Sequence, residues 1–308
     1  AKQTLRRKVC FLLRLSWQEV NPLPPNAFEA LTHAEYIRIE NEYRREIERL
    51  MKSMESVLRR AQTPDEFMRI LNSASYWADL YLSGEQAAKR MAARLNRAQS
   101  SSWRQAAAGS VQGRKLFRAL QKEMQTQIGA RIRDIVQQNS SLISSIPRKL
   151  APGMSKLALE GYRSGKRAAE IAEEMKAKLP AECRNRARLI ARTETAKAST
   201  ALVQSRAESL GLKFYIWRTS DDERVRDSHR AMDGVVCLWS SPPSPEAIAG
   251  EERTCGNYHP GDIFNCRCVA LPVIALEDLR FPVRVCMGGA NMVTIRNLAQ
   301  MQSLAQAA

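Results

Sequence analysis

The residues best suited to chemistry gather between residues 215 and 268. Two of the three histidines and four of the seven cysteines fall in this stretch. Cys266 and Cys268 stand two residues apart, so both thiols would point to one face of a strand. Because thiolate sulfur and imidazole nitrogen are the usual ligands of tetrahedral zinc, the stretch predicts a structural zinc site. The predicted ligands are His229, Cys255, Cys266 and Cys268, with His259 and Cys237 in reserve.

Two other interpretations of these residues stay open. The paired Cys-x-x-Cys knuckles typical of structural zinc sites are absent, so the cysteines can instead be buried thiols that bind no ion. In an enzymatic interpretation, His229 acts as a base with Asp227 or Asp233 in a metal-dependent nuclease. The hard oxygen ligands of that enzyme would be Asp221, Asp222 and Glu223. The alternative is that this acidic and basic cluster caps a helix and pairs internally.

Short strands and turns are expected to position these residues. Residues 215–218 are aromatic and β-branched, which favours a strand. The Asp233-Gly234 pair is a turn signal that leads into a second predicted strand at 235–238. A weak strand at 281–285 is expected to precede a short helix at 292–298.

The segment at 240–261 is rich in proline and is predicted to be a loop. Loops of this length inside a compact domain are uncommon unless they are functional or tied down. A metal bound by Cys255 or His259 is one way to tie this loop down.

Before residue 211 the sequence predicts a series of helices. Thr32-His33-Ala34-Glu35 and Thr63-Pro64-Asp65-Glu66 have the pattern of a capping box, and apolar residues at helical spacing follow each one. Glycine, serine and proline disfavour helix interiors, so breaks are expected where they occur. The expected breaks are at residues 83–84, 100–102, 139–153 and Pro180.

Charge divides the chain, with its net +16, into two unlike parts. Residues 1–210 carry 38 basic and 21 acidic side chains, a net of +17, whereas residues 211–308 carry 10 and 11, a net of −1. Ordinary solvated helix faces explain such an excess, and so does non-specific contact with the phosphates of duplex DNA. The candidate DNA contacts are Arg90, Arg94, Arg97, Arg114, Lys115 and Arg118.

Cysteine usage and hydropathy favour a protein made in a reducing cytoplasm. Seven cysteines among 308 residues are an odd number and too few for a disulfide scaffold. Arg14 ends the apolar run that follows Arg6-Arg7-Lys8 too early for a signal peptide or a membrane span, so no membrane partner is expected. The lack of a Gly-rich phosphate loop argues against a function driven by ATP or GTP.

An ordered set of short motifs in the second half of the chain resembles one known family. The motifs are Ala191-Arg192-Thr193-Glu194, the run from Trp217 to Arg226, Ser228-His229, Asp233-Gly234 and Asn265-Cys266-Arg267-Cys268. In this order, from about residue 161 to 272, they are similar to the Mu F-like phage head-morphogenesis family of minor capsid proteins. Some relatives carry a Cys-x-x-Cys pair in the region that corresponds to Ser228-His229. In this chain, only His229 in that region can serve as a ligand.

The resemblance implies a structural protein of the virion and not an enzyme. Such a protein assembles inside the procapsid, in the host cytoplasm, and its expected place is the capsid interior near packaged DNA. The portal protein and other capsid proteins are the implied partners, and self-association is a further expectation. The metal-dependent nuclease remains the alternative function.

Together these features predict an α+β protein. A mainly helical, basic N-terminal region is followed by a small α+β C-terminal domain that contains the Cys and His residues. The predicted segments are a basic arm and Pro-rich connector at 1–30, a helical region at 31–150, a Mu F-like head-morphogenesis domain at 151–276 and a C-terminal tail at 277–308.

Overall fold

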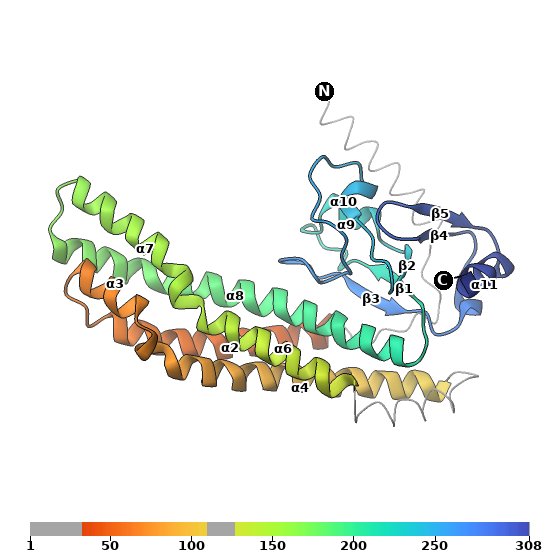
Figure 1. Ribbon diagram of the computed structural model, residues 1–308, viewed down its shortest axis with the longest axis horizontal. Coiled ribbons are helices and arrows are strands. Elements are labelled where there is room, and N and C mark those ends of the chain that lie inside the picture. The colour runs from red at the N-terminus through yellow and green to blue at the C-terminus, as the bar shows by residue number, and fades with distance from the viewer. Residues whose placement is uncertain (1–32, 110–126, 308) are drawn as a thin grey trace. The chain divides into compact units, whose positions relative to one another are not determined.

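The computed structural model describes residues 33–109 and 127–307, and its elements are drawn in Figure 1. The long helices are α2 (His33–Leu58), α3 (Pro64–Asn72), α4 (Ala78–Gly109), α6 (Gln127–Ser144), α7 (Ile146–Arg163), α8 (Ala168–Ser209) and α11 (Leu298–Ala307). The short ones are η1 (Ala74–Trp77), α9 (Asp227–Ala231), α10 (Pro245–Ile248) and η2 (Leu276–Asp278). The strands are β1 (Phe214–Arg218), β2 (Val236–Leu238), β3 (Val269–Pro272), β4 (Val283–Cys286) and β5 (Met292–Ile295). The predicted α+β class is confirmed.

The chain divides into two compact units, which we call the helical unit and the sheet unit. In the described part of the chain, the helical unit comprises residues 33–97 and 129–198, and the sheet unit comprises residues 98–109, 127–128 and 199–307. The four-part division of the sequence stays a prediction, and its arm at 1–30 lies outside the described residues. Among the described helices, none combines the length and the apolar character that crossing a lipid bilayer requires.

The start of α3 shows how the sequence sets a helix boundary. The Thr63 hydroxyl accepts a hydrogen bond from the Glu66 backbone N–H at 3.2 Å, and the Glu66 carboxylate accepts one from the Gln62 N–H at 2.8 Å. Pro64 occupies the first helical position, where a backbone N–H would have no acceptor carbonyl within the helix. The predicted Thr63 cap is confirmed, whereas the Glu66 carboxylate bonds one residue before the cap and not to the cap N–H of a regular capping box.

The helical unit packs around the apolar stripe of α2, and Figure 1 shows its helices lying lengthwise beside one another. Tyr43, Ile47 and Met54 are each at most 1% exposed. The Tyr43 hydroxyl donates to Asn139 Oδ1 at 2.7 Å, and the Asn139 side-chain N–H donates to the Ile135 carbonyl at 2.8 Å. A buried amide is thereby satisfied inside α6, in a region where a break is expected.

Tertiary packing overrides most of the predicted helix breaks. The helix continues through the predicted breaks at 83–84, 100–102 and Pro180, and the break at 139–153 is reduced to Ser145. Gly84 serves close packing, because a Cβ there would lie 3.1 Å from the Ile143 side chain. Leu179, next to Pro180, is 1% exposed. Burial of such side chains outweighs the local preferences of Gly and Pro.

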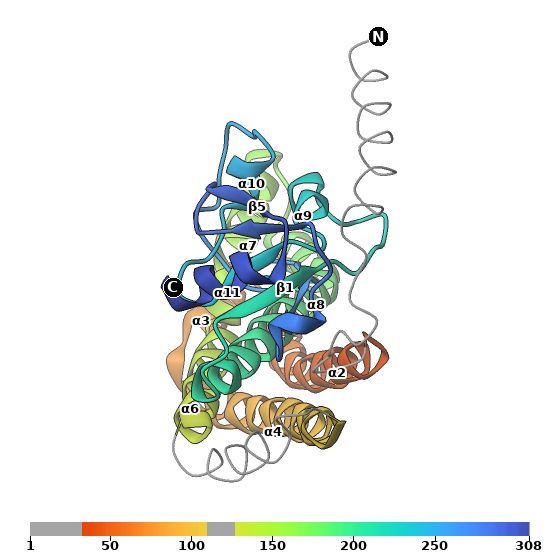
Figure 2. The ribbon, with the colours of Figure 1, turned by 90° about the vertical axis from the view of Figure 1, so that its right-hand side faces the viewer.

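The sheet unit contains a mixed sheet with strand order β3-β1-β2-β4-β5. Figure 2 labels two strands of this sheet, β1 and β5. β1 pairs antiparallel with β2 and β3, β2 pairs parallel with β4, and β4 pairs antiparallel with β5. The strands predicted at 215–218 and 235–238 are confirmed as β1 and β2. The helix predicted at 292–298 is wrong for its first residues, which form β5. Gly288 and Gly289 have positive φ values, and they turn the chain back beside β4.

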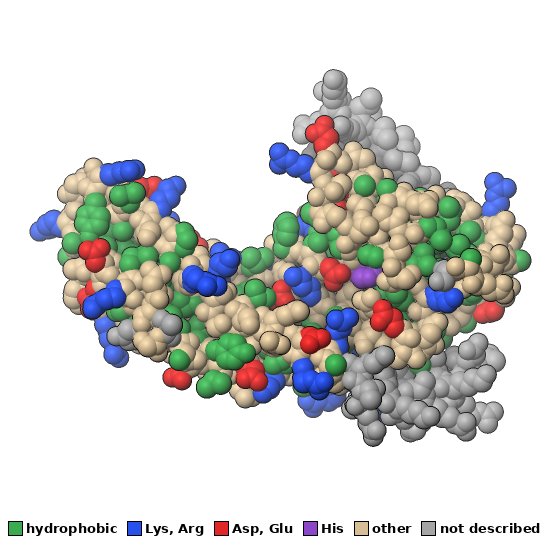
Figure 3. Space-filling view, viewed as in Figure 1, with side chains coloured by type: hydrophobic (Ala, Val, Ile, Leu, Met, Phe, Trp, Pro, Cys, Tyr) green, Lys and Arg blue, Asp and Glu red, His purple; other side chains and the backbone are tan. Residues whose placement is uncertain are grey.

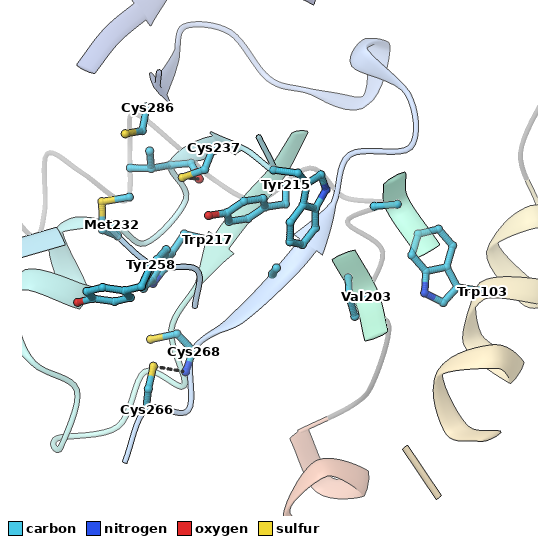
Figure 4. Packing of buried hydrophobic residues seen from close by; sticks show 14 residues of the cluster. Trp103, Val203, Tyr215, Trp217, Met232, Cys237, Tyr258, Cys266, Cys268 and Cys286 are labelled. Carbon is cyan, nitrogen blue, oxygen red and sulfur yellow. Dashed lines mark hydrogen bonds between the residues drawn. The ribbon is translucent and has the colours of Figure 1, made fainter. Parts of the chain in front are cut away.

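Apolar side chains are buried on both faces of the sheet. Tyr215 and Trp217 point to one face and Phe214 and Ile216 to the other, as alternation along a strand requires. The first face packs against side chains that include Trp103, Val203, Met232 and Tyr258 (Figure 4). The second face packs against Met301 of α11, so the last helix docks on its own unit.

Two glycines in α7 should respond in opposite ways to alanine. A Cβ at Gly161 would lie 2.6 Å from the buried Ile171 side chain, whereas a Cβ at Gly153 meets nothing within 4 Å. We expect Gly161→Ala to lower the free energy of unfolding by about 1–3 kcal/mol through overpacking. Gly153→Ala should raise it by up to about 1 kcal/mol, because alanine favours the helix. Urea denaturation of the full chain measures both, and equal shifts would contradict this packing.

Candidate metal centre

Three of the predicted ligands come together in the sheet unit. The Nδ1 atom of His229 and the Sγ atoms of Cys266 and Cys268 all lie within 4.8 Å of one another, and all three residues are buried. Nδ1 is 3.6 Å from Cys266 Sγ and 3.4 Å from Cys268 Sγ. His229 belongs to α9, between β1 and β2, and the two cysteines belong to the segment that leads into β3.

Cys266 and Cys268 meet through a turn and not, as predicted, on a strand. β3 begins only at Val269, and Asn265 has a left-handed backbone with φ of 58°. The turn lets the Cys268 backbone N–H donate to Cys266 Sγ at 3.4 Å, the dashed line in Figure 4. The Gly261 N–H donates to the same sulfur at 3.3 Å. Two N–H donors on one sulfur stabilise the thiolate, which is the form that binds metals.

The two thiols differ in acidity. The hydrogen bonds that Cys268 donates hold the pKa of the Cys266 thiol well below its usual range. The bond to Cys266, burial and the Cys266 charge raise the pKa of the Cys268 thiol. The indole N–H of Trp217 opposes that rise; it is buried and has no other hydrogen-bond acceptor within the described structure. The cysteine pair on its own therefore shares one negative charge.

The donor set and its spacing fit a soft divalent metal ion. Tetrahedral zinc holds a nitrogen and a sulfur ligand about 3.6 Å apart, given bonds of about 2.0–2.1 and 2.3 Å. The two nitrogen–sulfur distances here, 3.4 and 3.6 Å, agree with that separation. Two sulfurs and an imidazole nitrogen favour zinc or a similar ion over magnesium or calcium, which prefer oxygen ligands.

The other predicted ligands lie outside this group. Cys255 is exposed, and its backbone N–H donates to Glu246 Oε2 at 3.4 Å. His259 Nδ1 lies 3.0 Å from the Tyr215 hydroxyl oxygen, and burial lowers the pKa of His259 to about 4. The Cys237 thiol is buried in β2. Within the described residues, none of these three predicted ligands joins the group.

The loop after β2 is held by buried polar side chains that sequence reasoning missed. Tyr258 is 6% exposed, and Glu246 in α10 is 4% exposed. The Tyr258 hydroxyl donates to Glu246 Oε1 at 2.6 Å and lies 3.0 Å from His229 Nε2. Burial, and next the bond to Glu246, raise the pKa of Tyr258, so the phenol stays protonated. Glu246 follows Pro245, a pattern that indicates only the start of a helix.

Two of the five carboxylates in the enzymatic interpretation, Asp222 and Asp233, accept hydrogen bonds from basic side chains or backbone N–H groups. Asp222 accepts from the Arg224 N–H at 2.9 Å, and Asp233 accepts from the Arg218 guanidinium at 2.8 Å. Burial opposes the effect, yet the bond from Arg224 lowers the pKa of Asp222. The ring nitrogens of His229 contact two thiols and a phenol. For Asp222 and Asp233, this arrangement matches the internal pairing that the sequence left open.

The candidate DNA contacts differ in their surroundings. Arg90 and Arg94 of α4 pair with Glu46 of α2 at 2.9 and 3.2 Å. Arg97 is exposed, and the described part of the chain offers it no ion pair. On the face drawn in Figure 3, Lys and Arg side chains are interspersed with Asp and Glu. The remaining candidates, Arg114, Lys115 and Arg118, lie outside the described residues.

Comparison with known proteins links this region to a family. Residues 154–271 match the family described as Phage Mu protein F like protein, and this stretch contains all three residues of the candidate metal centre. The predicted family resemblance is thereby confirmed. An uncharacterized protein of Haemophilus influenzae is 35% identical over 136 residues, which cover 44% of this chain and 28% of the relative. No solved structure gives a significant match.

We expect the purified full chain to contain about one soft divalent ion, with zinc as the expected metal, because structural zinc sites normally survive purification. Cys266→Ser and Cys268→Ser should each lower the metal content several-fold, since each removes a thiolate from the buried group. Cys237→Ser is the matched control, because it changes another buried thiol of the same core and should leave the content unchanged. Elemental analysis after chelator-free purification measures the ratio. A wild-type value below about 0.2 ions per chain would exclude the site.

Proposed function

We propose that this chain, whose residues 154–271 belong to the Phage Mu protein F like family, is a minor head protein that acts in phage head assembly. The family match carries the proposal. In this proposal the chain works by binding other proteins and not by catalysis. Its partners are the portal protein and other capsid proteins, its place is the capsid interior, and assembly occurs in the host cytoplasm.

The proposed ion is zinc, and its proposed role is structural. Held by His229, Cys266 and Cys268, it would supply a cross-link between α9 and the segment before β3. Cys255 is the proposed fourth ligand, because it is exposed on the loop whose Tyr258 already reaches His229. Burial is the main cause of the raised pKa of Tyr258, and the nearby Cys255 adds to it. Unchanged zinc retention by Cys255→Ser against a chelator would exclude this fourth ligand.

A second proposed contact is with packaged duplex DNA. The net +17 of residues 1–210 would attract phosphates without reading bases. Arg97 supports this contact best among the described candidates, because Arg90 and Arg94 already have a carboxylate partner.

Heads purified from the phage that encodes this chain should contain it. We expect mass spectrometry to detect the chain in procapsids and in mature heads, and antibodies against it to recover the portal protein from procapsid extracts. A stop codon early in its gene should lower the yield of filled heads, and a wild-type copy in trans should restore it. Normal heads without the chain would contradict the proposal. Chelator-sensitive cleavage of DNA by the purified chain would favour the nuclease alternative.

Binding of the full chain to duplex DNA should weaken steeply with salt. We expect an affinity loss of at least tenfold between about 50 and 200 mM salt, because bound phosphates release counterions. Arg97→Ala should reduce the slope of log affinity against log salt by about 1. Arg224→Ala is the matched control: this arginine is also exposed, but it lies in the sheet unit and pairs with Asp222. Filter binding across a salt series measures both variants, and affinity that is independent of salt would exclude phosphate contact.

A further inference from the structure

A continuous line of buried hydrogen bonds leads from Glu246 to the candidate metal centre. Glu246 Oε2 accepts from the Cys255 N–H at 3.4 Å, and Oε1 accepts from the Tyr258 hydroxyl at 2.6 Å. The Tyr258 oxygen lies 3.0 Å from His229 Nε2, and the other ring nitrogen, Nδ1, faces the two thiols. Glu246, Tyr258 and His229 are between 2% and 6% exposed, so water has little access to the line.

The bond between Tyr258 and Glu246 favours a proton on one particular ring nitrogen of His229. A phenol has one hydroxyl proton, and here a carboxylate oxygen takes it. The phenol oxygen can therefore only accept a hydrogen bond from His229 Nε2. In the neutral ring, a proton on Nε2 leaves a lone pair on Nδ1, which faces the thiols 3.4 and 3.6 Å away.

We propose that Glu246 and Tyr258 are positioning residues that hold His229 in the tautomer able to bind a metal through Nδ1. The proposal rests on the metal centre put forward above. It adds that two neighbouring side chains set the tautomer of His229 before an ion binds. Metal-binding histidines commonly donate their second ring N–H to a carboxylate or another acceptor, which sets the tautomer and the ring orientation. Here a tyrosine stands between the imidazole and the carboxylate, and both come from the loop after β2.

Loss of the Tyr258 hydroxyl should favour the wrong tautomer. Without it, a buried Nε2–H has no acceptor, which is unfavourable. A proton on Nδ1 would instead face the Cys266 sulfur, which two backbone N–H groups already favour as a thiolate. That proton would occupy the lone pair that an ion needs, so metal binding would have to displace it.

The same core contains a matched control. Tyr215 is also buried, and its hydroxyl lies 3.0 Å from a ring nitrogen of another buried histidine, His259. Tyr215→Phe and Tyr258→Phe therefore remove the same atom from the same kind of tyrosine–histidine pair in one core cluster. Only Tyr258 contacts a histidine of the metal centre, so only its loss should affect metal binding.

The first measurement is the tautomer of His229 in the full chain without metal. Long-range proton–nitrogen NMR distinguishes the two ring nitrogens, and the chain has only three histidines to assign, with His229→Asn identifying the signal. We expect a protonated Nε2 in the wild type and in Tyr215→Phe, and a shift of the proton toward Nδ1 in Tyr258→Phe. An identical His229 spectrum in wild type and Tyr258→Phe would overturn the proposal.

The second measurement is zinc affinity by competition with a chelator of known affinity. We expect Tyr258→Phe to bind zinc at least about tenfold more weakly than wild type, and Tyr215→Phe to bind as wild type does. Glu246→Gln keeps an acceptor oxygen and should fall between them. Equal affinities of the two Phe variants would overturn the proposal. Absence of zinc binding in the wild type would instead overturn the metal centre, and the NMR spectra alone would then support or overturn the fixed tautomer.

Discussion

Buried polar atoms in the sheet unit each need a partner, and this need shapes the loop after β2. An unsatisfied buried donor or acceptor costs about 1–3 kcal/mol. His229 and His259 are both at most 8% exposed, and each ring lies within hydrogen-bond distance of a tyrosine hydroxyl. The loop folds inward to bring Tyr258 and His259 to these positions. Tyrosine–histidine bonds therefore tie down a loop for which the sequence suggested an ion at Cys255 or His259.

The sequence was enough to predict those parts of the candidate site that depend on the spacing of nearby residues. The Cys-x-Cys pair and the place of His229 between two predicted strands were enough to predict three residues that meet in space. The thiols converge through a turn at Asn265, however, and the strand predicted there does not form. The contacts of Tyr258 with Glu246 and His229 could not be predicted, because they join a loop to two short helices through side chains that carry no local pattern.

The same limit explains the fold. Residues 214–218 are recognisable as a strand, and the Thr63 cap starts a helix as predicted, because both signals act over a few residues. Breaks were predicted at Gly84 and Pro180, but the helices continue. Gly84 packs closely against Ile143 of α6, and Leu179, next to Pro180, is buried. β5 was predicted as helix because its strand character comes from pairing with β4, a neighbour in space that its own sequence does not reveal.

The distance along the chain between the parts of the metal centre affects how stability would respond to the surroundings. His229 is separated from the two cysteines by 37 and 39 positions, and an unfolded chain seldom brings such distant residues together. An ion that needs all three would thus bind the folded chain almost exclusively. By mass action it would add about 2.7 kcal/mol to the free energy of unfolding at a concentration one hundred times its dissociation constant. The fraction of chains with a folded sheet unit would then depend on the concentration of the free ion in the compartment.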